Sequence, residues 1–219
     1  LARLAPDVGD SEPNGLLAVG GSLTPEWLIH AYRHGVFPWF SAEQPILWWA
    51  PDPRAVLMPE EFRISRSLAR SIGRRGYETR INTAFTAVIE ACAGPRQGMP
   101  GTWITREMHE AYVLLHRRGL THSIETWHAG RLVGGLYGVG LGHAFFGESM
   151  FTRETDASKV ALARLVLECR ARNVPLIDCQ MPSPHLASLG SRNIPRWDFE
   201  ARLAGLIDSR VPVWREGHI

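Results

Sequence analysis

The sequence lacks the features of several protein classes. It has only three cysteines, Cys92, Cys169 and Cys179, with no CxxC spacing. Their odd number and apolar surroundings predict buried free thiols rather than a disulfide framework or a zinc site. No stretch approaches the roughly 20 uninterrupted apolar residues of a membrane helix, and the first twenty residues lack the apolar segment of a secretory signal. We therefore expect a cytoplasmic protein that does not contact a membrane.

Lysine is also nearly missing, since Lys159 is the only one among 24 basic residues. The formal net charge of +2 does not indicate a nucleic-acid partner. The arginines are unevenly spread, however, and six of them lie between Arg63 and Arg80 against the single acid Glu78. An arginine-rich helix over 65–74 is compatible with phosphate binding or with a solvated face, and composition leaves both open.

The change in composition and periodicity along the chain predicts two domains, 1–60 and 61–219. The first is rich in Pro, Gly and Trp and has one short helix, with Thr24 as its cap and Gly35 as its stop. The second has stronger periodicity. It predicts helices over 65–74, 83–92 (capped by Asn82), 106–118 (capped by Thr105), 157–172, 184–189 and 198–208, and strands over 121–127, 131–140, 143–150 and 176–180.

The three consecutive strands are separated by short turns and predict an antiparallel meander. A buried helix and a further strand follow. This order indicates an α+β fold, in which a small N-terminal domain precedes an acetyltransferase-like (GNAT-like) domain with a mostly antiparallel sheet.

Aromatic side chains in proline-rich loops are candidates for stacking on bases. Trp39 lies in Phe37-Pro38-Trp39-Phe40, where prolines restrict the loop, and a rigid indole suits an unstacked base. Trp103 precedes the helix over 106–118, where contact with a ligand and simple packing at the helix start are both possible.

Two of the predicted strands are apolar but contain polar residues, whose presence there needs an explanation. By alternation, Glu148 shares a strand face with Phe146 and Met150, where an unpaired carboxylate is costly to bury. Asp178 and Gln180 lie two apart on one strand and are expected to point the same way. Glu148 therefore either reaches water at an edge or belongs to a functional site. Asp178 and Gln180 are either a satisfied buried hydrogen-bonding pair or part of such a site, and we favour the site in both cases.

Other catalytic patterns are missing. The sequence has no phosphate-binding glycine loop and no HExxH motif, and Ser149 lacks the second glycine of a nucleophile elbow. His30 and His34 share a helix face without a further ligand nearby in sequence. We expect no metal and no cofactor.

Several segments resemble leucyl/phenylalanyl-tRNA–protein transferases, the bacterial aminoacyltransferases of the N-degron pathway. They are PNGLLAVGG (13–21), YRHGVFPWF (32–40), PILWWAPDPRAVL (45–57), GTWIT (101–105), HSIE (122–125), LVGGLYGV (132–139), FFGESMF (145–151), ASK (157–159), LIDCQ (176–180) and HLASLG (185–190). They run through almost the whole chain in the family's order.

The resemblance implies transfer of Leu or Phe, and less readily Met, from aminoacyl-tRNA to proteins that begin with Arg or Lys. It implies that Trp39 and Trp103, with Glu148, contact the terminal adenosine and that Asp178, Gln180 and Glu148 are catalytic. The aminoacyl pocket it implies is formed by Leu136, Phe145, Met150, Leu162 and Ile177. With a tRNA partner, Arg66, Arg70 and Arg74 become candidates for contacts to its backbone.

Two rival classes stay open at this stage. An acyl-CoA-dependent N-acyltransferase can have the same fold, although the link 152–158 has no glycine and two carboxylates where a pyrophosphate would bind. A non-catalytic tRNA-binding module would leave the Asp178 and Gln180 pair without a purpose.

Overall fold

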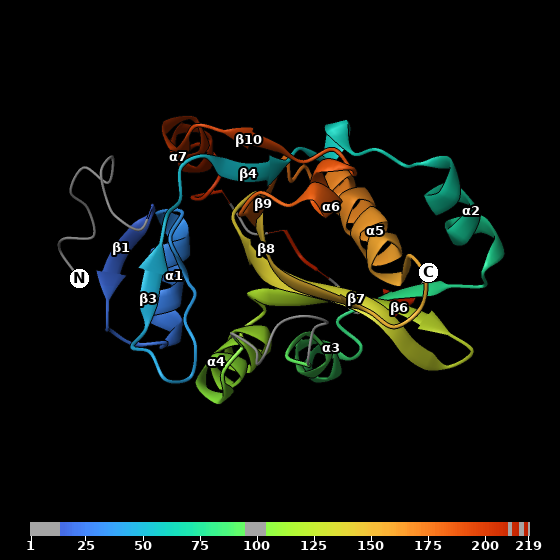
Figure 1. Cartoon of the computed structure of the whole chain (residues 1–219), viewed down its shortest axis with the longest axis horizontal. Helices are drawn as coiled ribbons and strands as arrows, with labels where there is room; N and C mark the ends of the chain where they lie inside the picture. The colour runs from blue at the N-terminus through green and yellow to red at the C-terminus, as the bar shows by residue number, and fades with distance from the viewer. Residues whose placement is uncertain (1–13, 95–103, 210–211, 215–216, 219) are drawn as a thin grey trace.

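The computed structural model describes residues 14–94, 104–209, 212–214 and 217–218 (Figure 1). The helices are α1 (Pro25–Arg33), η2 (Pro59–Glu61), α2 (Arg66–Arg74), α3 (Phe85–Cys92), α4 (Arg106–Arg117), α5 (Ala157–Ala171), α6 (Pro184–Ala187) and α7 (Arg196–Ala204). The strands are β1 (Leu16–Val19), β2 (Phe37–Pro38), β3 (Leu47–Trp49), β4 (Arg54–Leu57), β5 (Glu78–Ile81), β6 (Thr121–His128), β7 (Arg131–Leu141), β8 (Ala144–Thr152), β9 (Leu176–Gln180), β10 (Arg192–Ile194) and β11 (Gly217–His218). None of the helices within these ranges is long and apolar enough to cross a membrane.

Eight strands form one sheet in the order β10-β4-β9-β8-β7-β6-β5-β11. Strands β6, β7 and β8 pair antiparallel, which confirms the predicted meander. Helix α5 then crosses over the sheet, and β9 returns parallel to β8. All other pairs in this sheet are antiparallel. The α+β class and the mostly antiparallel sheet are therefore confirmed.

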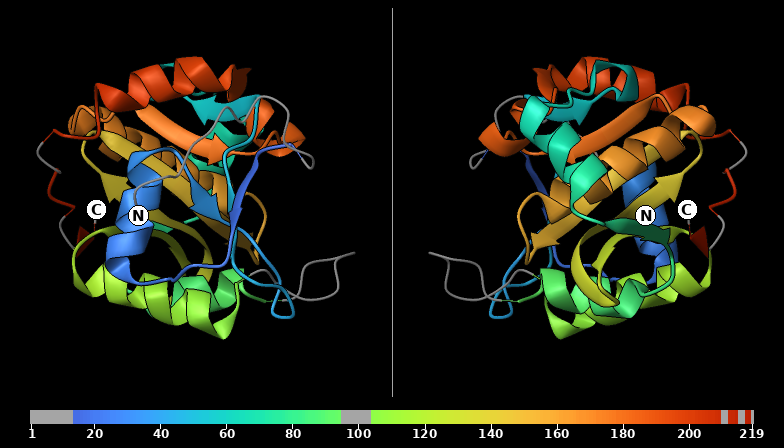
Figure 2. Two further views of the ribbon diagram at one scale, coloured as in Figure 1. Left: turned by 90° about the vertical axis from the view of Figure 1, so that its left-hand side faces the viewer. Right: turned by 90° about the vertical axis from the view of Figure 1, so that its right-hand side faces the viewer.

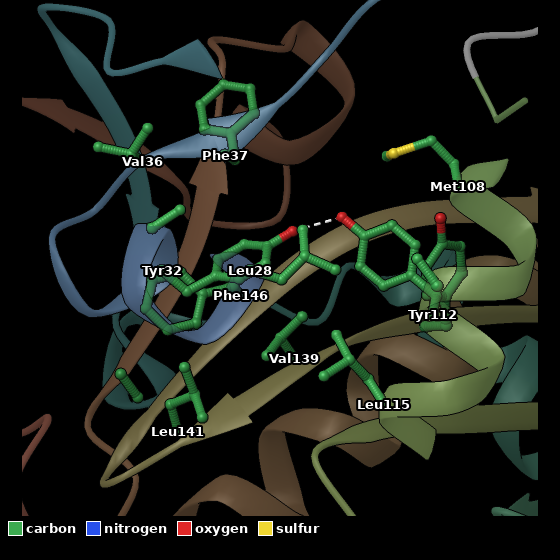
Figure 3. Packing of buried hydrophobic residues seen from close by; sticks show 14 of the residues in the cluster. Leu28, Tyr32, Val36, Phe37, Met108, Tyr112, Leu115, Val139, Leu141 and Phe146 are labelled. Carbon is green, nitrogen blue, oxygen red and sulfur yellow. Dashed lines mark hydrogen bonds between the residues drawn. The ribbon is translucent and has the colours of Figure 1, made fainter. Parts of the chain in front are cut away.

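Helices cover both faces of the large sheet. Figure 1 shows α5 and α2 on one side of β7, and α3 and α4 on the other. The side views in Figure 2 show the same layers. Two apolar clusters fill the spaces between them. One joins α1, α3 and α4 to the sheet, and Figure 3 shows Leu28, Tyr112 and Phe146 within it. The other lies under α5 and includes Leu136, Phe145 and other side chains.

The N-terminal segment forms its own small sheet, β1-β3-β2, beside α1. Trp48 is buried there, and its indole N–H donates to the carbonyl of Gly20. Strand β4 lies within the range expected for the small domain, yet it pairs with β9 and β10 of the large sheet. The chain thus enters the large sheet at Arg54.

Most predicted helix caps are confirmed. The hydroxyls of Thr24 and Thr105 accept from backbone N–H groups at the starts of α1 and α4. The predicted cap at Asn82 is wrong. Asn82 has a φ of 58°, and its side chain accepts from the Ser123 backbone instead. The buried carboxylate of Glu125, on β6, accepts from the backbone N–H groups just ahead of α3.

Candidate active site

Strands β8 and β9 stay paired over a short distance only. Their parallel register runs from Ala144 opposite Leu176 to Phe146 opposite Asp178, and β8 then continues to Thr152 paired only with β7. A cavity of about 200 Å³ lies where the two strands part. Its lining includes Gly147, Glu148 and Gln180. It is smaller than the roughly 300–1,000 Å³ typical of sites for drug-sized ligands, so it suits a single side chain better than a whole cofactor.

A β-bulge places Glu148 in this site. Tyr137 of β7 faces Ser149, whereas the next residue, Gly138, faces Gly147, so Glu148 is an extra residue in β8. Bulges re-aim side chains and interrupt alternation. Phe146 therefore packs with α1 and α4, whereas Met150 packs with the cluster under α5. The prediction that both share a face with Glu148 is wrong for Met150.

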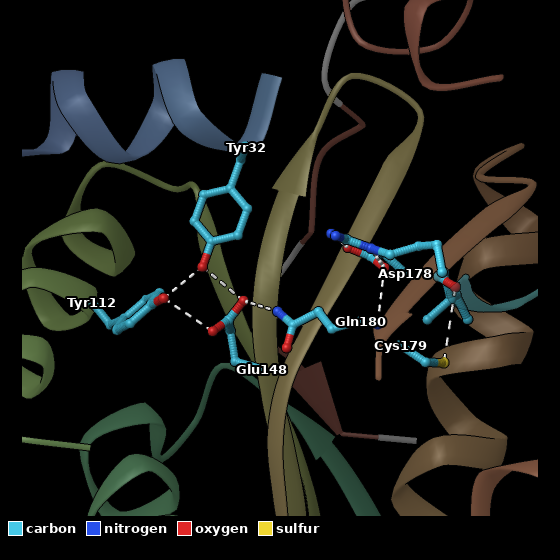
Figure 4. Close-up of polar contacts among 8 residues, drawn as sticks. Tyr32, Tyr112, Glu148, Asp178, Cys179 and Gln180 are labelled. Atoms are coloured by element: carbon cyan, nitrogen blue, oxygen red, sulfur yellow. Dashed lines mark hydrogen bonds and ion pairs between the residues drawn. The ribbon is translucent and has the colours of Figure 1, made fainter. Parts of the chain in front are cut away.

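The Glu148 carboxylate is almost fully buried and accepts three hydrogen bonds (Figure 4). The Tyr32 hydroxyl donates to Oε1 at 2.7 Å and the Tyr112 hydroxyl donates to Oε2 at 2.9 Å. The side-chain amide of Gln180 donates to Oε1 at 2.9 Å. These donors come from α1, α4 and β9, so Glu148 is the point at which three separate elements meet.

Burial controls the protonation of this cluster. Removal from water raises the pKa of Glu148 to about 7, and the three hydrogen bonds oppose that rise. Burial beside Glu148 also raises the pKa of Tyr32 and Tyr112 well above the ordinary range, so both phenols stay protonated donors. Near neutral pH the carboxyl can therefore both give and take a proton, as acid–base chemistry requires.

Asp178 and Gln180 lie side by side but bind different partners. Asp178 is fully buried, and its carboxylate accepts two bonds from Arg54, Nε to Oδ1 at 2.8 Å and Nη2 to Oδ2 at 2.7 Å. Asp178 Oδ1 also accepts from the Gln180 backbone N–H at 2.9 Å. The Gln180 side chain points to Glu148 (Figure 4). The structure thus brings all three predicted catalytic residues together.

Four of the five residues expected in the aminoacyl pocket line the cavity. They are Leu136, Met150, Leu162 and Ile177, joined by Leu165, Cys179 and Leu186. Phe145 does not line it. Its fully buried ring packs against Trp214 at a centroid distance of 5.3 Å. Phe145 thus supports the cavity from behind.

The expected nucleic-acid contacts lie outside the cavity. Trp39 is exposed, and its ring lies 5.7 Å from that of Trp49, whose indole N–H donates to the Trp39 carbonyl. Trp103 lies outside the described residues. The side chains expected to reach the tRNA backbone are exposed on α2, and none forms an ion pair within the part of the chain that the structure describes. They are Arg66, Arg70 and Arg74.

Sequence reasoning missed Tyr32, Tyr112 and Arg54. Tyr112 lies on the apolar face of α4, within the hydrophobic core. A buried tyrosine usually needs a partner for its hydroxyl, and this was the available signal. Tyr32 and Arg54 fall within the family-like segments 32–40 and 45–57, but nothing else in the neighbouring sequence distinguishes them.

No group of three or more potential metal ligands occurs within the described ranges. None of the three cysteines forms a disulfide within the described part of the chain. Cys169 is buried in the α5 cluster and Cys179 packs against it. Burial raises the pKa of both thiols well above the ordinary range. Since a thiolate is the reactive form of cysteine, neither is poised as a nucleophile.

Comparison with known proteins matches two family models. Residues 56–204 match leucyl/phenylalanyl-tRNA protein transferase and residues 21–52 match its N-terminal domain. The leucyl/phenylalanyl-tRNA–protein transferase of Thiobacillus denitrificans is 58% identical over 90% of this chain and 86% of its own length. That of Nitrosomonas europaea is 57% identical over 88% and 81%.

Among solved structures, a GCN5-related N-acetyltransferase-like protein from Streptococcus suis aligns over 77% of this chain and 63% of its own, at 14% identity and a TM-score of 0.37. The sequence matches span both the small N-terminal region and the large sheet that holds Glu148 and Gln180. The chain belongs to the leucyl/phenylalanyl-tRNA protein transferase family and is an aminoacyltransferase.

Proposed function

We propose that the protein transfers leucine or phenylalanine, and less readily methionine, from aminoacyl-tRNA to the N-terminal α-amine of proteins that begin with arginine or lysine. The added residue marks those proteins for N-degron proteolysis in the cytoplasm. The observation that carries the proposal is the small apolar cavity between β8 and β9, which has a carboxyl and an amide at its polar edge.

The cavity supports the choice of amino acid. Its walls include Leu136, Leu162 and Ile177, and its size suits one apolar side chain. Leu, Phe and Met are unbranched at Cβ, whereas the β-branched Val and Ile have fixed bulk at that carbon and fit a small cavity less well. Desolvating such a side chain contributes about 1.5–3 kcal/mol to binding.

The reaction needs no nucleophile from the enzyme. The donor is an ester to the tRNA ribose, and the acceptor amine attacks its carbonyl carbon. A C–N bond forms and the C–O bond to the ribose breaks. The amine loses a proton to Glu148, which passes it to the departing ribose oxygen, so the tRNA leaves with a free hydroxyl. The Gln180 amide donates its N–H to Glu148, so its carbonyl is available to accept from the attacking amine. Glu148, with a pKa of about 7, takes the proton.

Asp178 has a supporting part in this mechanism. Both carboxylate oxygens already accept hydrogen bonds from Arg54, and one also holds the Gln180 backbone. Asp178 therefore fixes Gln180 and does not take the proton directly. Its negative charge further raises the pKa of Glu148, after burial as the main cause, and thereby favours proton uptake there.

The tRNA partner is bound outside the cavity. The exposed indole of Trp39 offers a stacking surface for the terminal adenosine, and Trp103 is expected to do the same. Exposed guanidinium groups along α2 suit the phosphate backbone. These are the groups of Arg66, Arg70 and Arg74.

The acyl-CoA alternative is disfavoured at the start of α5. Asp156 occupies the N-cap position there, and its carboxylate accepts from Ser71 and Lys159. A pyrophosphate would have to approach this carboxylate, which is electrostatically unfavourable. No second candidate function is needed to explain the site.

Incubation with Leu-tRNA and a peptide that begins with arginine tests the proposal. Leucyl-peptide formed without CoA supports it. A requirement for acyl-CoA, or tRNA binding without product, would overturn it. Peptides that begin with lysine or alanine test the acceptor class. Asp178→Ala and Gln180→Ala should lower turnover far more than they weaken tRNA binding, and unchanged single-turnover rates in both would remove these residues from the mechanism.

A further inference from the structure

The Arg54 guanidinium is buried to an extent that needs explanation. Only 1% of Arg54 is exposed, and its central carbon lies 4.9 Å from the ring centre of Phe37 and 4.6 Å from that of Phe199. Among the described residues its Nη1 has no hydrogen-bond partner. A charge removed from water in this way is costly, even with a two-pronged bond to Asp178.

The ion pair is connected to the reaction centre by a continuous set of contacts. Asp178 Oδ1 accepts both from Arg54 Nε at 2.8 Å and from the Gln180 backbone N–H at 2.9 Å. Gln180 has a φ of 63°, which side-chain-bearing residues seldom adopt without a local reason. The pairing of β4 with β9 also slips at this point, so that Cys179 is an extra residue in β9. The carboxylate therefore holds Gln180 in an uncommon backbone conformation.

That conformation directs the Gln180 side chain. Its amide reaches Glu148 at 2.9 Å, away from the Asp178 carboxylate that holds its backbone (Figure 4). Stability alone is a weak reason for such a pair, because replacing a buried ion pair by apolar residues is often neutral or favourable. The planar guanidinium of Arg54 forms two parallel hydrogen bonds to the Asp178 carboxylate and so fixes the orientation of that carboxylate, which a single ammonium group would not do.

We propose that Arg54 is a positioning residue of the transferase site, which acts through Asp178 to hold the Gln180 amide against Glu148, with Phe37 and Phe199 fixing the plane of its guanidinium. This inference rests on the transfer reaction proposed above. It extends the working site from the cavity to helix α7, which carries Phe199.

Arg54→Lys is the direct test, because it keeps the positive charge and removes the paired hydrogen bonds to Asp178. We expect kcat for transfer from Leu-tRNA to fall at least tenfold, with KM for Leu-tRNA changed less than twofold. Arg202→Lys is the matched control, since Arg202 also bonds an aspartate, Asp198, but on the exposed side of α7. Its kcat should equal that of the wild type. A folded Arg54→Lys variant with wild-type kcat would overturn the proposal.

A double-variant cycle separates positioning from general damage. If Arg54 acts through Gln180, adding Arg54→Lys to Gln180→Ala causes little further loss, and the double variant turns over within about threefold of Gln180→Ala alone. Losses that multiply would show that Arg54 acts by another route. If Arg54→Lys does not fold, Phe199→Leu replaces it in the same cycle, because it removes one ring and leaves the ion pair intact.

A measurement without substrate keeps the inference separate from the proposed activity. Burial raises the pKa of Glu148, and the hydrogen bond from Gln180 opposes that rise. Displacing the amide should therefore raise the pKa of Glu148 in Arg54→Lys, as followed by carbon-13 NMR of the carboxyl. An unchanged Glu148 pKa would refute the positioning role. A wild-type protein that yields no leucyl-peptide would refute the activity instead, while the NMR result still decides on Arg54.

Discussion

The stability of Glu148→Gln relative to the wild type should increase as the pH rises. Glu148 is only 8% exposed, and burial raises its pKa from 4.5 to about 7. Between these values the folded protein keeps a proton that the unfolded chain releases. The wild type therefore loses stability as the pH rises from about 4.5 to 7, and the loss levels off above the folded pKa.

The magnitude follows from the two pKa values. Each unit of difference corresponds to about 1.4 kcal/mol. Relative to its stability at low pH, the wild type has lost about 0.8 kcal/mol at pH 5, where the unfolded carboxyl is already partly ionised. At pH 8 this loss of stability reaches about 3.3 kcal/mol. The free energy of unfolding of Glu148→Gln minus that of the wild type should thus increase by about 2.5 kcal/mol between pH 5 and pH 8. Glutamine keeps one oxygen that can accept from Tyr32, and its NH2 group can donate to the Tyr112 hydroxyl in the position of Oε2, so the site keeps its hydrogen bonds.

Urea unfolding at the two pH values measures both proteins. All other titrating groups are common to the two and cancel in the difference. Asp198→Asn, at an exposed salt bridge on α7, is a control in which the difference should stay nearly constant over this range. A pH-independent difference for Glu148→Gln would show that the carboxyl is ionised throughout, and would remove it as the proton acceptor.

Three further outcomes follow from the same geometry. Replacing the α2 arginines with glutamine should lower the slope of log K for tRNA binding against log salt by about 2–3, as measured by filter binding, and an unchanged slope would make α2 a solvated face only. The three are Arg66, Arg70 and Arg74. Leu162→Phe narrows the cavity and should reduce transfer of phenylalanine more than that of leucine in a competition assay, whereas equal losses would place the side chain elsewhere. Gly134→Ala should destabilise the fold by roughly 1–3 kcal/mol, because a Cβ there would lie 2.7 Å from the Ala157 carbonyl carbon. Gly73→Ala, in an open position on α2, is its control in urea unfolding and should not destabilise. A Gly134→Ala variant as stable as the wild type would contradict the close approach of β7 to α5.

Elements with strong local patterns were readable from the sequence. Helix α5 has a broad apolar face, and the meander has short turns at Ala129-Gly130 and Gly142-His143, so both were placed to within one or two residues. Caps at Thr24 and Thr105 followed from the same local chemistry. Asn82 is not a cap because its side chain accepts a hydrogen bond from Ser123 of β6, more than forty positions away. The local sequence gives no sign of that partner.

The site was predictable in its residues but not in its connections. Glu148, Asp178 and Gln180 stood out as polar groups in apolar strands. Their partners did not, because Tyr32 is 116 positions from Glu148 and Arg54 is 124 positions from Asp178. The two bulges were equally hidden. A bulge depends on the register between two strands, and alternation along one strand gives no sign of it.

The convergence on Glu148 connects the small N-terminal region to the candidate active site. Its helix α1 supplies Tyr32, while Tyr112 and Gln180 come from the body of the protein. Each donated hydrogen bond lowers the pKa of Glu148 against the effect of burial. Tyr32→Phe removes this one donor while keeping the ring that covers the site, so it should raise that pKa further and leave the carboxyl protonated at neutral pH. A protonated Glu148 cannot accept the proton of the attacking amine, so Tyr32→Phe should slow transfer from Leu-tRNA at neutral pH, and a variant with the wild-type rate would contradict this role of Tyr32.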